Sequence, residues 1–151
     1  MAREALFNVL NGELDLNGID VLDLFTGTGA IAIEFISRGA ASATAIDVDY
    51  ISKRFIDSIK REWEIDNLKV VKADIFKLMK KANQSFDVVF ADPPYADPRY
   101  PQLPDMLFES GWIKKDGLLI LEHSEEHSFE THPYFQSHRK YSSVNFSFFR
   151  K

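Results

Sequence analysis

The chain lacks cysteine altogether, which excludes disulfide bonds and thiolate metal sites. The soft metal ligands that remain are four histidines, His123, His127, His132 and His138. His123 and His127 stand four residues apart, a spacing that would place both rings on one face of a helix. The residues between them do not follow the His-Glu-x-x-His order of zinc proteases. We therefore expect surface histidines and no metal site.

Long apolar runs and an excess of basic residues are also lacking. No stretch is long enough to span a bilayer, and the N-terminal residues carry charge where a signal peptide would be apolar. We expect a soluble, cytoplasmic protein. The formal net charge of −5 argues against a protein that coats nucleic acid by charge alone, because neutralising phosphates needs clustered Lys and Arg. The length of 151 residues predicts one domain.

Short apolar runs alternate with segments of 3.6-residue period, a pattern typical of strands and helices around a mostly parallel sheet. Strands are predicted at 21–25, 43–46, 68–71, 87–91 and 118–122. Helices are predicted at 3–10, 30–38, 50–65, 75–82 and 103–109. The tail differs, because 139–141 and 144–149 indicate an antiparallel hairpin that closes the sheet. These elements predict a doubly wound α/β fold with a mostly parallel, seven-stranded sheet.

The segment 50–65 carries a regular apolar repeat. Ile51, Phe55, Ile59 and Trp63 recur every four residues. This period predicts an amphipathic helix whose apolar side lies on the sheet. We expect its aromatic rings to belong to the core and not to a binding surface.

The ends of the first three predicted strands carry residues suited to a cofactor. In sheets of this class, ligands bind beyond the carboxyl ends of the strands. The first strand runs into a loop, Phe25 to Gly29, where Gly27 and Gly29 let the backbone approach a ligand. Asp47 ends the second strand and can accept hydrogen bonds from both hydroxyls of a ribose. Asp74 ends the third strand, where its carboxylate can accept the amino group of an adenine.

A glycine loop followed by a ribose-binding acid occurs in NAD enzymes and in S-adenosylmethionine (SAM) enzymes. Two details favour SAM. Ala32 stands where the dinucleotide fingerprint has its third glycine, and Asp23 can meet an ammonium group, which NAD lacks. The structural alternative is that glycines make turns and acids cap helices, as we expect of Asp49. The occurrence of such residues at three strand ends together favours a cofactor site over purely structural roles.

The tetrapeptide Asp92-Pro93-Pro94-Tyr95 follows the buried run 86–91 directly. Prolines cannot continue a strand, so the chain leaves the sheet here in a stiff conformation. Asp92 and the carbonyl of Pro93 are placed to accept the two hydrogens of an amino group, and Tyr95 can stack on a flat ring. A nucleobase is the natural substrate, and the motif by itself suits guanine or adenine.

In this order, the segment 23–29, Asp47, Asp74 and the segment 92–95 resemble the motif series of class I SAM-dependent methyltransferases that act on exocyclic amino groups. Three further segments, at 3–8, 37–40 and 111–112, resemble the bacterial 16S ribosomal RNA guanine-N2 methyltransferase family. The resemblance covers essentially the whole chain.

This resemblance implies one SAM-dependent methyltransferase domain over 1–151, with a class I, Rossmann-like fold. It implies methyl transfer from SAM to the N2 amino group of a guanine in 16S rRNA, by a monomer acting on the 30S subunit or an assembly intermediate. Carried over by motif, the cofactor is bound by Asp23, Phe25, Gly27, Gly29, Asp47 and Asp74. The base is bound by the catalytic loop Asp92, Pro93, Pro94 and Tyr95.

Two features depart from the family pattern. Members usually carry a basic N-terminal extension with a hairpin, whereas this chain begins almost at Arg3, so that segment is missing here or RNA docking differs. The predicted C-terminal hairpin has Ser142 where a glycine is often found, which needs only a local adjustment.

Three other functions remain open. An N6-adenine methyltransferase acting on DNA or RNA would use the same tetrapeptide. A protein glutamine methyltransferase fits less well, because those enzymes usually have Asn where Asp92 stands. The alternative from another class is an NAD-binding or non-catalytic nucleotide-binding α/β domain.

Overall fold

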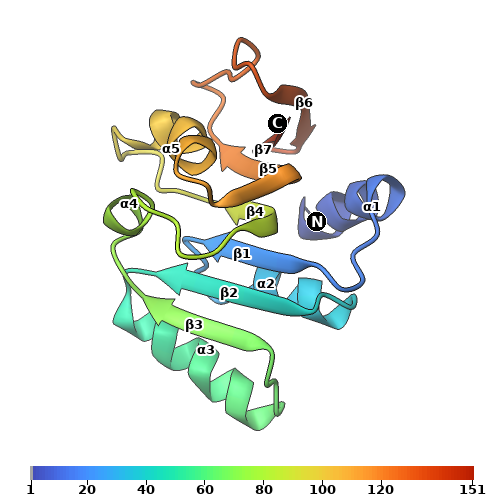
Figure 1. The fold of residues 1–151 in the computed structure, drawn as a ribbon, viewed down its shortest axis with the longest axis vertical. Coiled ribbons are helices and arrows are strands. Elements are labelled where there is room, and N and C mark those ends of the chain that lie inside the picture. The colour runs from blue at the N-terminus through green and yellow to red at the C-terminus, as the bar shows by residue number, and fades with distance from the viewer. Residues whose placement is uncertain (1) are drawn as a thin grey trace.

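A single sheet of seven strands organises the computed structural model, which describes residues 2–151 (Figure 1). The strands are β1 (Asp20–Leu24), β2 (Ser42–Asp47), β3 (Leu68–Lys72), β4 (Phe86–Ala91), β5 (Ile113–His123), β6 (Phe135–Tyr141) and β7 (Val144–Arg150). Their order across the sheet is β3-β2-β1-β4-β5-β7-β6. Strands β1 to β5 pair in parallel, and β7 is antiparallel to both β5 and β6. The predicted doubly wound fold with a closing hairpin is confirmed.

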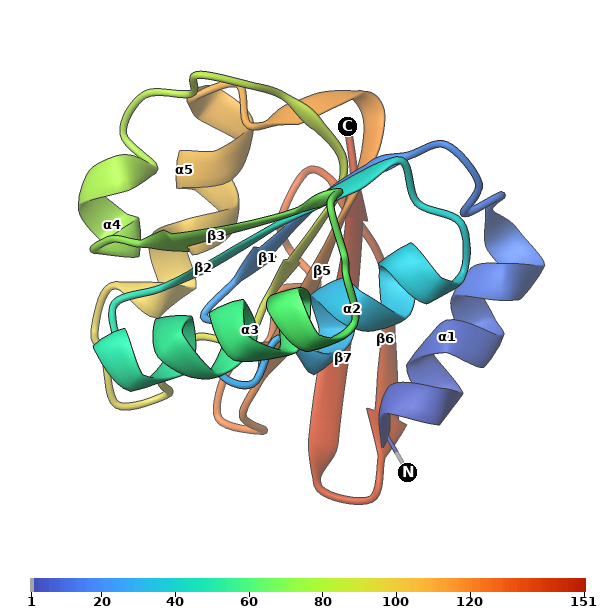
Figure 2. The ribbon, with the colours of Figure 1, turned by 90° about the horizontal axis from the view of Figure 1, so that it is seen from below.

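Helices cover both faces of this sheet. They are α1 (Ala2–Glu13), α2 (Ala30–Ser37), α3 (Tyr50–Glu62), α4 (Ile75–Leu78) and α5 (Leu103–Glu109). Figure 2 shows α1, α2 and α3 on one face, with α4 and α5 on the other. No helix in the described part of the chain is both long and apolar enough to cross a membrane.

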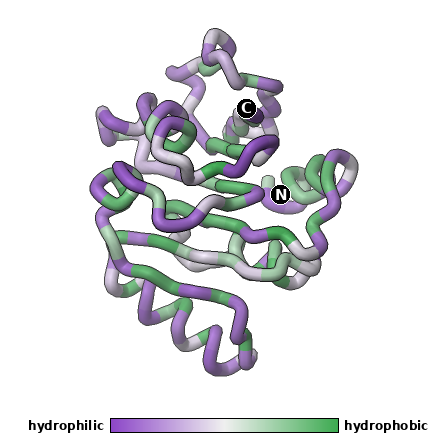
Figure 3. The backbone as a smooth tube through the Cα atoms, in the orientation of Figure 1, coloured by the Kyte–Doolittle hydropathy of each residue, from purple (hydrophilic) through white to green (hydrophobic). Residues whose placement is uncertain are grey.

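Two apolar clusters fill the space between sheet and helices. Val88 and Phe90 of β4 pack into the cluster under α1 and α2, whereas Val89 and Ala91 pack into the one under α4 and α5. Successive side chains of a strand point to opposite faces, so a strand buried on both faces is apolar throughout. Figure 3 shows this as hydrophobic colour along the central strands. The same burial holds the carboxyl ends of β1, β4 and β5 side by side.

The prediction that the apolar repeat of α3 lies in the core is wrong. Ile51, Phe55 and Trp63 are 74%, 47% and 60% exposed, and the buried residue of the helix is Ile56. The helix lies beside the edge strand β3, where little sheet surface is available, and Ile56 fills the space next to Gly29. The aromatic side chains line an open groove against α2 instead.

Several element ends differ from the prediction. β5 starts at Ile113, five residues before the predicted start at 118. Residues 114–116 are polar, so no apolar run marks this part of the strand in the sequence. Lys114 forms an ion pair with Asp87 at 3.3 Å. α4 ends at Leu78, four residues before position 82. Ser142 adopts the left-handed conformation that a glycine would favour at the hairpin turn, with φ of 57°.

Candidate functional site

The glycine loop after β1 is shaped by the carboxylate of Asp23. This side chain is 1% exposed, and its Oδ2 atom accepts the Thr26 hydroxyl at 2.6 Å and the Ala32 N–H at 3.1 Å. Asp23 therefore ties the loop to the first turn of α2. Burial raises the pKa of this carboxyl to about 7, although both hydrogen bonds act in the opposite direction.

The loop itself needs residues that tolerate positive φ. Phe25, Gly27 and Gly29 have φ values of 58°, 58° and 77°. A Cβ atom on Gly29 would lie 3.0 Å from Ile56, so this glycine lets α3 approach α2 closely. A Cβ atom on Gly27 would meet nothing within 4 Å. The backbone at Gly27 therefore faces open space, as a ligand-binding loop requires.

Asp47 and Asp74 stand at the ends of the neighbouring strands β2 and β3. Asp47 accepts the Gly27 N–H at 2.9 Å through Oδ2 and the Asp49 N–H at 3.0 Å through Oδ1. Asp74 caps α4 by accepting the Lys77 N–H at 3.4 Å. Val48, directly after Asp47, is 61% exposed and offers an apolar surface beside the loop. This edge can take a sugar and a flat ring.

The segment Asp92–Tyr95 leaves β4 beside the same loop. The N–H of Asp92 donates to the carbonyl of Leu24 at 3.3 Å, which joins the end of β4 to the end of β1. Pro93 is buried, and Tyr95 is 43% exposed. The Tyr95 hydroxyl donates to Glu122 of β5 at 3.3 Å. Three strand ends thus meet around Asp92.

A small acidic cavity of about 100 Å³ lies between these strand ends. Asp23, Asp92 and Glu122 all line it, together with Arg3, whose guanidinium is 3.9 Å from Glu34. Burial and the neighbouring Glu122 carboxylate raise the pKa of Asp92 to about 8. The pKa of Tyr95 is also raised, by burial first and then by Glu122 and Asp92. A cation bound here would lower these pKa values and pair with the ionised carboxylates, so the cavity favours a cationic ligand.

These raised pKa values predict how stability depends on pH. A carboxyl whose folded-state pKa lies above its unfolded value of 3.8 stabilises the fold below about pH 4, and this contribution is lost as pH rises through 7 and 8. Asp92→Asn should therefore flatten the decline of the free energy of unfolding between pH 5 and 8, by at most about 1.4 kcal/mol per pH unit. Urea unfolding at several pH values measures this, and a slope equal to that of the wild type would contradict it.

The histidines do not form the predicted surface set. His123 is 2% exposed at the end of β5, and His127 lies in the connection to β6, so the two share no helical face. The expectation of a surface position is wrong for His123. Among residues 2–151, no group of three or more His, Asp or Glu side chains is placed to hold a metal ion.

Comparison with known proteins places this geometry in a family. The model of the family described as Conserved hypothetical protein 95 matches residues 1–150. The chain belongs to this family. Curated relatives named ribosomal RNA small subunit methyltransferase D include one from Buchnera aphidicola, 34% identical over 120 residues, and one from Escherichia coli, 30% identical over 134 residues. The matches cover 80% and 87% of this chain but only 61% and 65% of those relatives. The resemblance to rRNA methyltransferases is thereby confirmed.

Solved structures agree with the family in fold. The Escherichia coli protein yhhF superposes with a TM-score of 0.88 at 24% identity, covering 99% of this chain and 84% of that one. Coclaurine N-methyltransferase, solved with N-methylheliamine and SAH, matches with a TM-score of 0.65 at 27% identity, over 81% of this chain and 36% of the other. The fold of the family member described here is that of class I methyltransferases.

The structure brings most of the predicted site residues to one sheet edge. Asp23 and Asp47 each accept a hydrogen bond from the glycine loop, Asp23 from Thr26 and Asp47 from Gly27. The segment that carries Asp92 and Tyr95 is held to the end of β1 beside this loop. Sequence reasoning missed two residues at this edge. Glu122 ends a strand just as Asp47 and Asp74 do, so the same rule applied to the fifth strand would have found it. Val48 carries no such signal, because an isolated valine after a strand is usually buried.

Proposed function

We propose that this chain transfers a methyl group from SAM to the exocyclic N2 amino group of a guanine in 16S rRNA. The substrate is the 30S subunit or an assembly intermediate, and the enzyme acts as a cytoplasmic monomer with one methyltransferase domain over 1–151. The observation that carries the proposal is the acidic cavity, in which Asp92 and Glu122 stand beside the glycine loop and next to Tyr95. The names of the curated relatives support the choice of small-subunit rRNA.

The residues of the loop fit SAM better than NAD. SAM carries a sulfonium and an ammonium group, and the cavity beside the loop is lined by three carboxyl groups. NAD carries a negatively charged pyrophosphate, which the same carboxyl groups would repel. Gly27 leaves room for the ligand, Asp47 would hold the ribose and Val48 would cover the adenine. Asp74, which caps α4 in this structure, would accept a hydrogen bond from the amino group of the adenine.

Two acceptors side by side favour guanine over adenine. The Watson–Crick edge of guanine presents N1–H next to its N2 amino group, whereas N1 of adenine is an acceptor. Asp92 can accept one amino hydrogen, and Glu122 can accept N1–H, because both carboxyl groups line the same cavity. An adenine would place its N1 lone pair against the Glu122 carboxylate. This arrangement supports N2 of guanine as the methylated atom.

The chain's contribution to the reaction is positioning and proton removal. SAM, when bound, supplies a methyl group on a positively charged sulfur that leaves readily as a thioether. Asp92 and the carbonyl of Pro93 accept the two amino hydrogens and so direct the nitrogen lone pair toward that methyl group. The positive charge of bound SAM would lower the pKa of Asp92 again and leave its carboxyl ionised. As the N–C bond forms, the amino nitrogen becomes acidic and Asp92 takes the released proton. Tyr95, half exposed and held by Glu122, stacks on the flipped base.

Calorimetric titration separates the main classes of function. We expect the protein to bind SAM and not NAD, and to transfer labelled methyl groups from SAM to 30S particles or 16S rRNA but not to DNA. Binding of NAD alone would contradict the proposal in favour of a nucleotide-binding domain. Label appearing only in DNA would contradict the choice of rRNA.

A further inference from the structure

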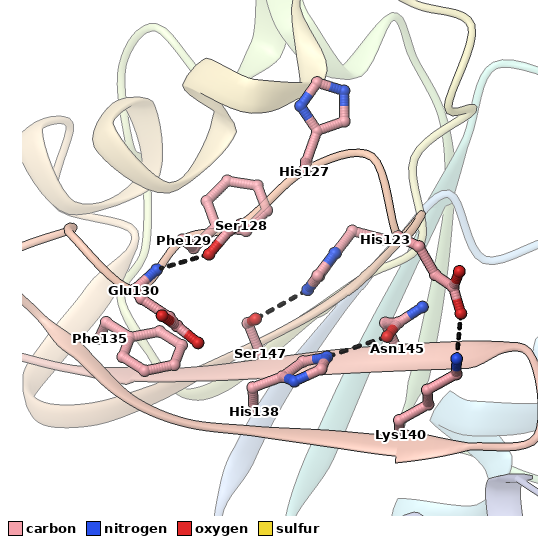
Figure 4. A pocket seen from close by; sticks show the side chains of 11 residues that line it. His123, His127, Ser128, Phe129, Glu130, Phe135, His138, Lys140, Asn145 and Ser147 are labelled. Carbon is pink, nitrogen blue, oxygen red and sulfur yellow. Dashed lines mark hydrogen bonds and ion pairs between the residues drawn. The ribbon is translucent and has the colours of Figure 1, made fainter.

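A second cavity lies on the opposite side of β5 from the acidic cavity. We call it the hairpin pocket, because it lies between the β6–β7 hairpin and the segment 123–130 (Figure 4). Its volume is about 310 Å³. The polar groups that line it include His123, Glu125, His138, Lys140, Asn145 and Ser147. The strand register places His123 opposite Asn145, while Glu122 is opposite Phe146 and points the other way.

Two of these polar groups satisfy each other. The Nδ1–H of His123 donates to the carbonyl of Ser124 at 2.9 Å, since a carbonyl can only accept. Its Nε2 atom therefore accepts the hydroxyl of Ser147 at 2.7 Å. Burial lowers the pKa of His123, so the ring stays neutral in this network. Neither side chain has a donor left for a ligand.

Asn145 is different, because one end of its amide is unpaired. Its Oδ1 atom accepts the Nε2–H of His138 at 2.9 Å. Its Nδ2 atom is buried and has no hydrogen-bond partner among the described residues, and the residue is 3% exposed. In Figure 4 this nitrogen points into the space between His123 and Lys140. A buried donor without a partner is unfavourable, so a ligand that offers an acceptor to the Asn145 amide would be stabilised here.

The other walls of the hairpin pocket select the kind of acceptor. Glu125 and Glu130 line it, and the Lys140 ammonium in its wall is already paired with Glu125, so the pocket does not favour a phosphate or another anion. Phe129 and Phe135 provide aromatic surfaces. A nucleobase has a flat ring to stack on such surfaces, carbonyl oxygens for the Asn145 amide and N–H groups for the carboxylates. Each nucleobase presents an acceptor for this donor, a carbonyl oxygen in guanine, uracil and cytosine and a ring nitrogen in adenine.

Aromatic contacts connect this pocket to the methyl-accepting loop. The ring of Tyr95 is 5.8 Å from that of Tyr100, which is 4.8 Å from the His127 ring at the pocket wall. The Tyr100 hydroxyl is also 3.4 Å from the hydroxyl of Ser124. Tyr95 and the pocket wall are thus two ring contacts apart, so a nucleotide that flanks a base stacked on Tyr95 can reach the hairpin pocket.

We propose that the hairpin pocket binds an unstacked nucleobase that flanks the target base in the RNA strand, with an acceptor atom of the base on the Asn145 amide. This inference rests on the proposed function, because the strand is the methyl-accepting RNA. The exposed ion pair between Lys140 and Glu125 bridges the segment 123–130 to β6. Exposed pairs are weak, so its opening gives the base access to Asn145.

The chemistry of the pocket is tested by NMR on the 15N-labelled full chain. The side-chain amide signals of Asn145, assigned from their absence in Asn145→Leu, should shift on titration with guanosine, uridine or adenosine. Ribose should bind at this signal about ten-fold more weakly, because it carries no base. Equal shifts with ribose, or no shift with any of the three nucleosides, would overturn the assignment.

The role in RNA binding is tested by the kinetics of methyl transfer to 30S particles or 16S rRNA. Asn145→Leu should raise the KM for RNA about ten-fold, with kcat and SAM affinity unchanged. It should change the free energy of unfolding little, because the loss of the hydrogen bond from the exposed His138 ring is offset by the removal of the unpaired buried Nδ2 donor. The matched control Gln136→Leu removes an exposed amide from the same hairpin and should leave the KM unchanged.

The outcomes separate this inference from the proposed function. An unchanged KM in Asn145→Leu would overturn the flanking-base site even if nucleosides bind. If the wild type methylates no RNA, the proposed function fails and the flanking-base role fails with it, whereas the NMR titration still decides whether the pocket binds a nucleobase.

Discussion

Asp92→Ala should lower the rate of methyl transfer about 10²–10⁴-fold while leaving the affinity for SAM nearly unchanged. Asp92 is the residue that the fold places between the glycine loop and Glu122, with its backbone fixed to the end of β1. Without its carboxylate the amino group loses both an acceptor for its hydrogens and the base that removes its proton. Single-turnover assays for the rate and calorimetry for SAM measure the two quantities separately.

A suitable control for this variant is Asp66→Ala, which removes an exposed carboxylate far from the sheet edge and should change neither quantity. An Asp92→Ala enzyme with full activity would remove Asp92 from the catalytic role. A large loss of SAM affinity with little change in rate would instead assign Asp92 to the cofactor site.

Asp47→Ala should weaken SAM binding about 10- to 100-fold, the effect of losing hydrogen bonds to a charged acceptor. Its carboxylate now accepts the N–H of Gly27, so it both shapes the loop and stands where a ribose would bind. Asp49→Ala, two residues further along the chain, is the matched control, because Asp49 caps α3 through the N–H of Ile51. Calorimetry showing equal SAM affinity in Asp47→Ala and the wild type would exclude Asp47 from the cofactor site.

The parts of the fold that follow from burial could be predicted from the sequence. The central strands are apolar on both faces, so runs such as 87–91 indicate β4 whatever their neighbours are. The C-terminal hairpin could also be predicted from the sequence, since Val144, Phe146 and Phe148 alternate with polar residues. Because parallel strands have their carboxyl ends at one edge of the sheet, the sequence could also predict that Asp23 and Asp92 lie at the same edge.

The wrong predictions have a common physical cause. The spacing of apolar residues along a helix does not tell how much surface the neighbouring sheet offers to cover them. The repeat of Ile51, Phe55 and Trp63 is that of a buried helix face, yet α3 lies at the sheet edge and leaves these side chains exposed. The contact between Glu122 and Tyr95 could not be predicted from the sequence either, because the two residues are 27 positions apart in the chain. The hairpin pocket needs the β5–β7 register, which no local pattern contains.

The most direct test of the account is the identity of the nucleoside that the enzyme produces. The wild type is incubated with methyl-labelled SAM and 30S particles, naked 16S rRNA or DNA, and the nucleic acid is digested to nucleosides for chromatography. We predict label in N2-methylguanosine, since Asp92 and Glu122 together match the amino group and N1–H of guanine. Label in N6-methyladenosine would contradict this account.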